Sequence, residues 1–563
     1  MIAIRHPMSV NEKPGEFRLL IECHKRHPGA CGEFWFATGS RKTIPDLERE
    51  VATFARYRPL CEEAGIKLGY QQGLTLGHGE SHDGKPRPGD QTFPDDAWQR
   101  GRDGARIPFL CPRAPAVLEY ERQYAATVMR AANPSSYWID DDLRLGVSHP
   151  EGCFCDRCIA AFNAWAGAAW TREALAAALF AADGADAALR SAWIAFNAES
   201  LALYAAQVRR AADETGYAGF LGYQAVSANR LYPGRGYRPL LAALSGPGRR
   251  PVGIRPGHGF YNEAEPRGMV AKCLGVAREA ERCRGTVASI CYEEETYPRL
   301  MLHKSPGAIV TECALALASG CDSLSLYWFP GEAPLPVAEY DRFLAILATA
   351  RPYFGRLAAS ARRSRLGGLA RLAGPHPAPD FDLSDPADFD LACAGIPVTV
   401  AEGAPSAFYL TGKSRAEGFA AGAHNCGAEG FAAGAPAPAV IDISDIGRFP
   451  TAARRARLLD ALDAATGGAF PVRVDECRPL RILPRVRPDG RLDSVTLLNL
   501  SIGATGPLAV RVRNPAGPVV LLDSPLLTAP QRAALAQGAL PGEAVVSLPD
   551  LGPWQIATLF FEK

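Results

Sequence analysis

Short apolar runs that alternate with amphipathic helical stretches are the feature that most constrains the fold of this chain. The predicted strands are rich in β-branched and aromatic residues and lie at 17–23, 66–73, 136–140, 219–226, 251–257, 286–294 and 322–329. A repeated strand-then-helix unit implies parallel strands, because a helical crossover returns the chain to the same end of the sheet. About eight such units fit a closed (β/α)8 barrel better than an open sheet. Our candidate for the one strand that the pattern does not show clearly is 105–111.

The carboxyl ends of the strands are where a barrel of this kind carries its chemistry. Polar residues and one tryptophan follow most of the predicted strands, so we expect them to surround a common site. They are Glu22, His24, Gln71, Gln72, His78, Asp140, Asp141, Asp142, Gln224, Arg255, His258, Glu293, Glu294, Glu295 and Trp328.

The sequence changes character after about residue 360, which indicates further domains. A Pro- and Gly-rich stretch there is typical of a boundary. We predict a barrel at 1–360, a small α/β domain at 361–475 and a C-terminal β-sandwich at 476–563, where short strands alternate between apolar and polar residues. The heptapeptide EGFAAGA occurs twice, at 417–423 and 429–435. This repeat is too short for a solenoid and predicts a pair of loops.

Bulk composition narrows the class of protein. The 563 residues carry a formal net charge of +1, so electrostatic recognition of nucleic acid is not expected. No apolar window is long enough to cross a membrane, and the N-terminal segment lacks the apolar core of a signal peptide. We therefore expect a cytoplasmic protein. The 15 cysteines are odd in number and mostly isolated in apolar runs, which argues against a disulfide framework.

One group of cysteines is not isolated. Cys153, Cys155 and Cys158 bring three thiols together, and a closed structural zinc site needs four ligands. Cys111 is the fourth ligand we favour, and His149 is the local alternative. The competing interpretation is three unrelated buried cysteines. A redox pair is less favoured, because the spacing does not open a thioredoxin-type helix.

Four segments around these cysteines read CPRAPAVLEYERQYAATV, WIDDDLRL, GCFCDRCIAAFNAWAG and AWIAFNAESLALYAAQVRRAADETG. In this order they resemble the motifs of glycoside hydrolase family 42, the β-galactosidase family. The resemblance implies a structural zinc ion held by Cys111, Cys153, Cys155 and Cys158. It also implies a barrel followed by a small α/β trimerisation domain and a short β-domain, and hence a homo-oligomer, either a trimer or a dimer.

An acidic run stands where this family has the acid/base of strand four. Retaining glycosidases use two carboxyl groups, one a protonated acid and the other an ionised nucleophile. The family's strand four ends in Asp-Asn-Glu, and this chain reads Asp140, Asp141, Asp142 there. The resemblance therefore implies Asp142 as the acid/base, with Asp141 in the place of the Asn. Because Asp is one methylene shorter than Glu, either Asp141 or Asp142 could serve as the acid.

A second acidic run stands at the end of strand seven. The family's Glu-x-x-Pro motif falls on ETYP and implies Glu295 as the nucleophile. Period-two alternation places Glu293 on the same side as Glu295 and makes it the second candidate. Glu294 points to the other side, where we expect it to pair with a cation from a helix.

Aromatic residues near these runs could raise the pKa of the acid and stack on a sugar ring. Tyr137, Trp138 and Trp328 are the candidates, and the alternative is that they belong to the barrel core. Sugar hydroxyls also need polar partners. For substrate binding we select Glu22, Gln72, His78, Gln224, Arg255, Tyr261 and Trp328.

The sequence thus predicts a retaining, exo-acting glycoside hydrolase that resembles β-galactosidases, acts on a carbohydrate and is stabilised by structural zinc. Four thiolates leave no open position on the metal, so the zinc has no part in the chemistry. Two alternatives stay open. The first is a catalytically inert carbohydrate-binding barrel, suggested by the missing Asn-Glu pair. The second is a hydrolase of another class that uses the glutamate run with a metal.

Overall fold

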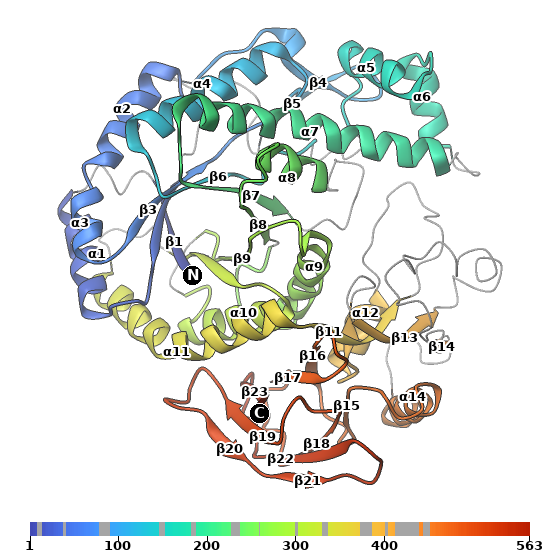
Figure 1. Ribbon diagram of the computed structural model, residues 1–563. Helices are drawn as coiled ribbons and strands as arrows, with labels where there is room; N and C mark the ends of the chain where they lie inside the picture. Colours follow the sequence, from blue (N-terminus) through green and yellow to red (C-terminus); the bar gives the residue numbers. More distant parts are fainter. Residues whose placement is uncertain are drawn as a thin grey trace.

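Eight parallel strands close into a barrel, which confirms the predicted (β/α)8 fold (Figure 1). The computed structural model describes residues 1–7, 14–37, 41–77, 90–145, 152–181, 187–226, 237–257, 259–298, 302–328, 336–371, 386–399, 404–410, 439–442 and 451–562. The barrel strands, in order around the barrel, are β1 (Ile2–Pro7), β2 (Glu33–Ala37), β3 (Lys67–Gln72), β6 (Ser136–Ile139), β7 (Phe220–Val226), β8 (Val252–Gly257), β9 (Ser289–Glu295) and β10 (Ser323–Tyr327).

One predicted strand is wrong, a second is a strand outside the barrel, and two barrel strands were missed. Residues 17–23 lie within helix α1 (Pro14–Arg26), because Phe17, Leu20 and Ile21 follow the helical repeat and are all buried. Segment 105–111 forms β5 (Arg106–Leu110), which pairs with β4 (Trp98–Arg100) in a two-stranded sheet outside the barrel. The missed strands are β1 and β2.

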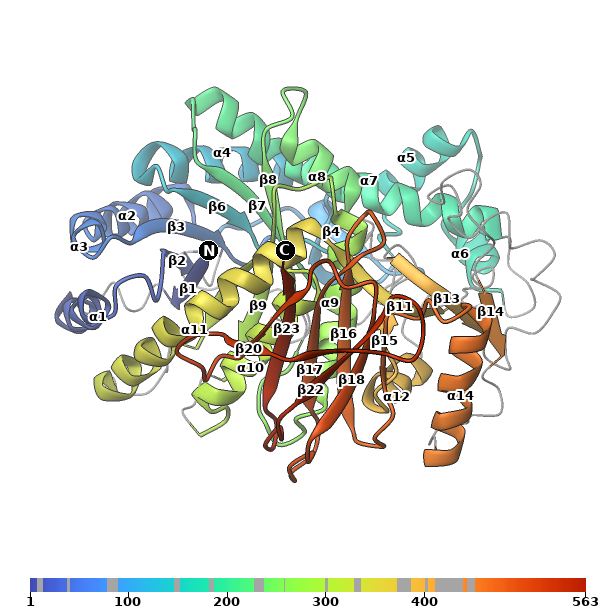
Figure 2. The same cartoon turned by 60° about the horizontal axis from the view of Figure 1, so that its bottom comes forward.

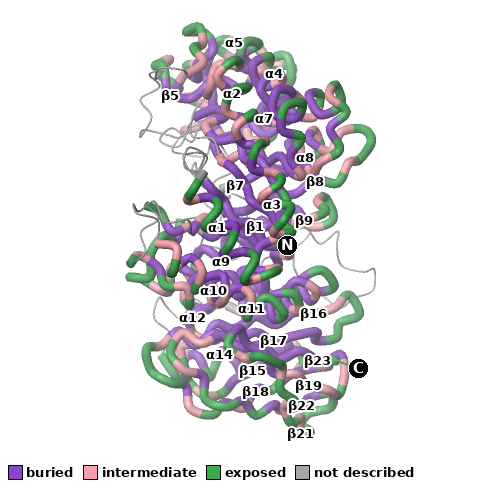
Figure 3. The backbone as a smooth tube through the Cα atoms, turned by 90° about the vertical axis from the view of Figure 1, so that its left-hand side faces the viewer, coloured by how far each residue is buried: buried purple, intermediate pink, exposed green. Residues whose placement is uncertain are grey.

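Helices surround the barrel as a ring, and in Figure 1 the strands are seen at its centre. The ring and its neighbours comprise α1, α2 (Ile44–Ala55), α3 (Arg58–Glu63), α4 (Pro115–Ala132), α7 (Ala187–Thr215), α8 (Arg238–Ser245), α9 (Gly268–Cys283), α10 (Pro306–Ser319) and α11 (Val337–Arg363). Figure 3 shows the strands buried and the outer helix faces exposed. No helix in the described ranges is long and apolar enough to cross a membrane.

The barrel interior is filled by alternate residues of each strand. Ala3, Trp35, Trp138 and Cys291 form a buried cluster at its centre, and the two indole rings lie 4.5 Å apart. Trp138 therefore belongs to the core, as the alternative interpretation of the sequence held. Because side chains alternate along a strand, this cluster fixes which later residues of β1, β6 and β9 also point inward.

Two further sheets follow the barrel (Figure 2). The larger runs in the order β14-β13-β11-β16-β17-β23-β19-β20, with β12 beside β11, and the smaller in the order β15-β18-β22-β21. Their strands are β11 (Arg365–Arg371), β12 (Val398–Thr399), β13 (Ala404–Leu410), β14 (Ala439–Asp442), β15 (Val472–Val474), β16 (Leu480–Val486), β17 (Leu492–Asn499), β18 (Leu508–Arg513), β19 (Val519–Asp523), β20 (Gln531–Ala533), β21 (Leu535–Gln537), β22 (Glu543–Leu548) and β23 (Ile556–Glu562).

The larger sheet crosses the predicted boundary at 475/476, because β11 pairs antiparallel with β16. Valines and leucines of both sheets, such as Val495 and Val510, form the apolar core between them. Three short helices lie outside the ring and the sheets: α5 (Asp156–Ala166), α6 (Arg172–Leu179) and α12 (Pro386–Cys393). A fourth, α14 (Ala452–Ala465), precedes β15. The EGFAAGA repeat lies outside the described residues.

Arg485 of β16 joins the C-terminal part to the barrel helices. Its guanidinium is fully buried and donates hydrogen bonds to the carbonyl of Ala318 at 3.0 Å and that of Ala361 at 3.1 Å. It also donates to the hydroxyl and the carbonyl of Ser364. One side chain therefore satisfies acceptors at the ends of α10 and α11 that water cannot reach.

We expect Arg485→Met to lower the free energy of unfolding by about 3 kcal/mol, because several buried acceptors lose their donor. Denaturant unfolding followed by circular dichroism measures the loss. Arg491→Met is the control, since this residue pairs with Asp489 on an exposed hairpin. The control should change stability by less than about 0.5 kcal/mol. An equal loss in both variants would contradict the proposed role of Arg485.

Candidate active site

The inward positions at the carboxyl ends of the strands carry charged and amide side chains. Counting in twos from the central cluster leads from Ala3 to Arg5, from Trp138 to Asp140, and from Cys291 to Glu293 and Glu295. The positions on β3, β7 and β8 are Gln71, Gln224 and Arg255, all of which are buried.

Ion pairs connect these side chains across the barrel. Glu293 Oε1 accepts from Arg5 Nη1 at 2.7 Å and is also in contact with Arg255 Nη1. The other terminal nitrogen of the Arg255 guanidinium, Nη2, lies 3.7 Å from Asp140 Oδ1. The Arg5 guanidinium lies 4.4 Å from the ring centroid of Tyr327. One guanidinium therefore spans the carboxylates of strands four and seven, counted around the barrel.

Asp140 is a carboxyl group at the mouth of the barrel with a raised pKa. Burial, followed by the negative charges of Asp141 and Asp142, raises the pKa of Asp140 from 3.8 to about 7, although two nearby arginines oppose the shift. Gln71 Nε2 donates to Asp140 Oδ1 at 3.0 Å. A carboxyl group of this pKa can hold a proton near neutral pH and release it.

The other two aspartates of the run lie in the loop after β6. Asp142 is buried, and its Oδ2 accepts a hydrogen bond from the main-chain N–H of Leu74 at 3.1 Å. Arg144 Nη2 lies 3.6 Å from the other oxygen of Asp142, and Arg144 Nη1 lies 4.0 Å from Asp141 Oδ2. Asp142 is thus held within the loop, whereas Asp141 is half-buried. Each aspartate of the run offers an oxygen within 4.8 Å of the others.

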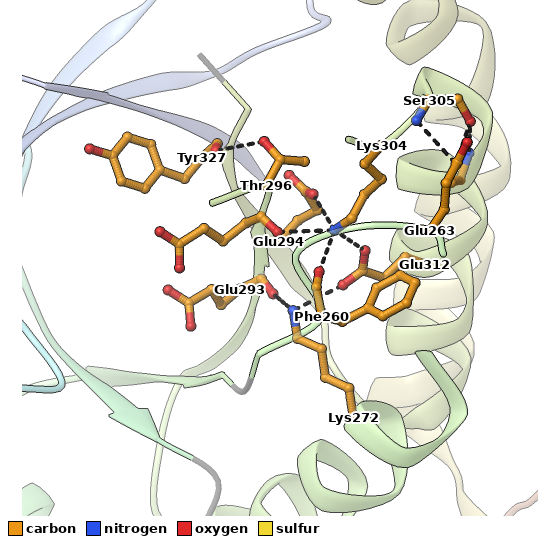
Figure 4. Close-up of polar contacts among 12 residues, drawn as sticks. Phe260, Glu263, Lys272, Glu293, Glu294, Thr296, Lys304, Ser305, Glu312 and Tyr327 are labelled. Carbon is orange, nitrogen blue, oxygen red and sulfur yellow. Dashed lines mark hydrogen bonds and ion pairs between the residues drawn. The ribbon is translucent and has the colours of Figure 1, made fainter. Parts of the chain in front are cut away.

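The three glutamates of β9 divide between the two faces of the strand, as predicted. Glu293 points into the barrel, and Glu294 points outward, where its Oε1 lies 2.9 Å from Lys304 Nζ (Figure 4). This ion pair confirms the expected cation on the helix side. Glu295, at the open end of the strand, is half-buried.

Tyr261 follows β8 and lies close to both acidic runs. Burial, followed by the negative charges of Glu295 and Asp141, raises its pKa to about 12. The phenol therefore stays protonated and can donate a hydrogen bond at neutral pH. Its partial exposure is compatible with the predicted role in substrate binding.

Three residues predicted to bind substrate lie elsewhere. Gln72 points to the helices, where Nε2 donates to Glu121 Oε2 at 2.6 Å. Glu22 is exposed on α1 and pairs with Lys25. Trp328 is buried against α11, with its ring centroid 4.1 Å from that of Phe343. The prediction for Glu22 fails because its segment is a helix. The prediction for Gln72 fails because neighbouring residues of a strand point to opposite faces, so that Gln71 faces the barrel interior and Gln72 faces the helices.

Two of the predicted or considered histidines, His78 and His258, lie outside the described residues. His24 is buried in α1, and its Nε2 lies 2.8 Å from the hydroxyl of Tyr340. Arg5 was missed because β1 was not recognised, although Ile2, Ala3 and Ile4 form a short apolar run before it.

The inner wall also carries polar atoms that lack partners among the described residues. Neither amide atom of Gln224 has a hydrogen bond, and the hydroxyl of Ser325 has none. Both side chains are completely buried. Buried polar groups are normally satisfied, so these atoms indicate a place for water or for the hydroxyl groups of a ligand.

A buried four-cysteine cluster lies beside the barrel, next to β5 and α5. The Sγ atom of Cys111 is 3.8 Å from that of Cys155 and 3.6 Å from that of Cys158, and Cys153 completes the group. Ligands at the 2.3 Å Zn–S distance of a tetrahedral site stand about 3.8 Å apart. The separations of Cys111 from Cys155 and Cys158 therefore match a tetrahedral metal site, and all four sulfurs lie within 4.8 Å of one another.

Solved glycoside hydrolases share this fold over the whole chain. α-L-Fucosidase isoenzyme 2 from Paenibacillus thiaminolyticus matches with a TM-score of 0.57 and 13% identity, over 96% of this chain and 96% of that one. The β-galactosidase from Bacillus circulans sp. alkalophilus matches with a TM-score of 0.58 and 11% identity, over 100% and 98%. Gan42B, a β-galactosidase of glycoside hydrolase family 42, matches with a TM-score of 0.59 and 11% identity, over 100% of this chain and 98% of that one. At such identities the likeness establishes the fold.

No family model matches the sequence, and neither does any curated protein. The resemblance to family 42 thus rests on the three-dimensional structure and on the short motifs around the cysteines and carboxylates.

We expect Asp140→Asn to change how stability depends on pH. Because its pKa is raised in the folded protein, Asp140 contributes stability at low pH that is lost as the pH rises toward 7. Relative to wild type, the variant should therefore gain up to about 1.4 kcal/mol per pH unit between about pH 4 and 7. Urea unfolding at pH 5, 6 and 7 measures this difference.

The same titration contains its own control. At pH 8 to 9 Asp140 is ionised in both the folded and the unfolded protein, so the two stability curves should run parallel there. Curves that stay parallel down to pH 5 would contradict a raised pKa at Asp140.

Proposed function

We propose that this protein is a glycoside hydrolase that uses carboxyl groups of β-barrel strands four and seven. The observation that carries the proposal is the pair of inward acidic positions at those two strand ends, where Asp140 has a pKa of about 7. A glycosidase needs one carboxyl group that is protonated and one that is ionised. The fold shared with a fucosidase and β-galactosidases supports a carbohydrate as the substrate.

The position of Asp140 supports it, rather than Asp142, as the acid/base. Asp142 is held by the Leu74 main chain and is only 2% exposed, whereas Asp140 faces the barrel interior. For the nucleophile we propose Glu295, which is half-buried at the open end of β9. Glu293 is the second candidate, although its carboxylate already contacts two guanidiniums.

The reaction then follows the retaining scheme of two displacements. The Glu295 carboxylate attacks the anomeric carbon while Asp140 gives its proton to the departing glycosidic oxygen. Asp140, now ionised, removes a proton from water, and this water releases the sugar from Glu295 with its anomeric configuration retained. Gln224 and Ser325 supply buried polar groups that can bind sugar hydroxyls, and Tyr261 supplies an exposed phenol.

For the four-cysteine cluster we propose structural zinc. The sulfur separations suit a tetrahedral ion, and Cys111, Cys153, Cys155 and Cys158 would fill all four positions. The ion would fix the start of α5 to the end of β5. The resemblance to family 42 further suggests a homo-oligomer and an exo-acting preference for β-galactosides.

A panel of aryl glycosides that starts with β-galactosides tests the proposed function. We expect Glu295→Gln to lower kcat by at least about 100-fold on every hydrolysed sugar. Asp140→Asn should lower kcat more for phenyl than for dinitrophenyl glycosides, because a poor leaving group depends more on the acid. Glu22→Gln, on the outer face of α1, is the control and should keep the wild-type rate.

Two outcomes would contradict the proposal. Wild-type turnover that both Glu295→Gln and Asp140→Asn leave unchanged would show that the catalytic residues lie elsewhere. A wild-type protein that binds sugars in calorimetry and hydrolyses none of the panel would favour the carbohydrate-binding barrel. The Arg255 guanidinium between the carboxylates of Glu293 and Asp140 is the observation that favours this second function.

Metal analysis tests the zinc proposal. The purified protein should contain about one zinc ion per chain, and Cys158→Ser should lose most of it together with thermal stability. Cys477→Ser is the control, because this cysteine is exposed and outside the cluster. A wild-type protein without bound metal after purification in zinc-containing buffer would contradict the proposal.

A further inference from the structure

A second group of charges lies directly behind the proposed catalytic strand, outside the barrel (Figure 4). Lys272 of α9, Lys304 just before α10, Glu294 of β9 and Glu312 of α10 are all completely buried at their side chains. Two positive and two negative groups form this buried lysine–glutamate network. Its position on the helix side of β9 separates it from the inward carboxylates.

The two lysines hold main-chain atoms of β9. Lys272 Nζ donates to the carbonyl oxygen of Glu293 at 2.7 Å, and Lys304 Nζ donates to that of Glu295 at 3.0 Å. These are the two residues of β9 whose side chains occupy the inward positions at the carboxyl end. Figure 4 shows the Glu293 side chain directed away from Lys272.

These carbonyls lie in the part of β9 that has register partners on β10 but none on β8. β9 pairs with β10 as far as Glu295, but its register partners on β8 end at Ile290. Backbone carbonyls that are buried need donors. The ammonium groups of Lys272 and Lys304 supply donors beyond the point where the β8 ladder stops.

Glu312 holds both lysines in place. Its Oε1 lies 2.9 Å from Lys272 Nζ and its Oε2 lies 2.8 Å from Lys304 Nζ. Tyr292 donates its hydroxyl to Glu312 Oε1 at 2.5 Å. Lys304 also donates to the carbonyl of Phe260 at 2.7 Å, which ties the segment after β8 to the same point. Burial raises the pKa of Glu312, but the two lysine charges outweigh it and lower the pKa, so this carboxylate stays ionised.

We infer that Lys272 and Lys304 are positioning residues, which fix the carboxyl end of β9 so that Glu293 and Glu295 stand at a set depth in the barrel mouth. The catalytic consequence rests on the proposed function. A reacting group displaced by about 1 Å can lose about 100-fold in rate, so a clamp on the strand backbone has a measurable effect. Neither lysine would touch the substrate, because both lie behind the strand.

The test uses a charge-balanced double variant, because a single buried lysine cannot be removed without leaving an unpaired carboxylate. Lys304→Met with Glu294→Gln removes one charge of each sign and releases the carbonyl of Glu295. Glu294→Gln alone is the matched control, since it leaves the bond from Lys304 to that carbonyl in place. Lys272→Met with Glu312→Gln is the corresponding double variant at the Glu293 end.

Hydrogen exchange of the peptide spanning 291–297 and steady-state kinetics are the two measurements. In the Lys304 double variant we expect exchange at least tenfold faster than in the control, with peptide 136–140 unchanged. We also expect kcat to be 10- to 100-fold lower than in the control with KM within about threefold, a split that general destabilisation does not produce.

Each outcome decides the inference. Unchanged exchange in a folded double variant would overturn it, and so would faster exchange with an unchanged kcat. If wild type hydrolyses no glycoside, the proposed function fails and the exchange arm alone decides the clamp. If neither double variant folds, the wild-type protein still provides the test. Rapid exchange of 291–297 in wild type, typical of an unsupported strand end, would overturn the clamp.

Discussion

The interior of a closed eight-stranded barrel accepts only alternate residues of each strand, and the rest of this structure follows from that constraint. The central layer is apolar, with Trp35 and Trp138 in contact. The next inward layer is charged, and charges in such a place must pair. Arg5 and Arg255 therefore gather around Glu293, and Arg255 reaches Asp140. The proposed active site is thus the layer in which the barrel core gives way to paired charges.

The same alternation separates two groups of charges that share one strand. Glu293 faces the barrel and its guanidiniums, whereas Glu294 faces the helices and Lys304. The inner group can change its protonation, because the pKa of Asp140 lies near 7. The outer group combines ammonium donors with carboxylates and holds the backbone. One group is suited to proton transfer and the other to rigidity.

Much of the fold could be predicted from the sequence, because six of the barrel strands lie in short apolar or aromatic runs that are followed by helices. β1 and β2 were not predicted. β1 occupies the first residues of the sequence, and the apolar residues of α1 were interpreted as the first strand. Within the candidate site, the alternation of side chains along a strand was enough to predict that Glu294 points outward. The same count from Trp138 gives Asp140 as the inward residue, whereas the family motif implies Asp142 as the acid/base. Which cations pair with Glu293 depends on strands far apart in the sequence, so no local pattern could reveal it.

The central claim is that a carboxylate at the end of strand seven attacks the sugar. A 2-deoxy-2-fluoroglycoside of a sugar that the protein hydrolyses would trap that covalent intermediate, and peptide mass spectrometry would locate it. The account predicts stoichiometric inactivation with the label on Glu295, in the peptide that follows Cys291. A label on a residue outside 293–295, or continued turnover with no label on the protein, would contradict it.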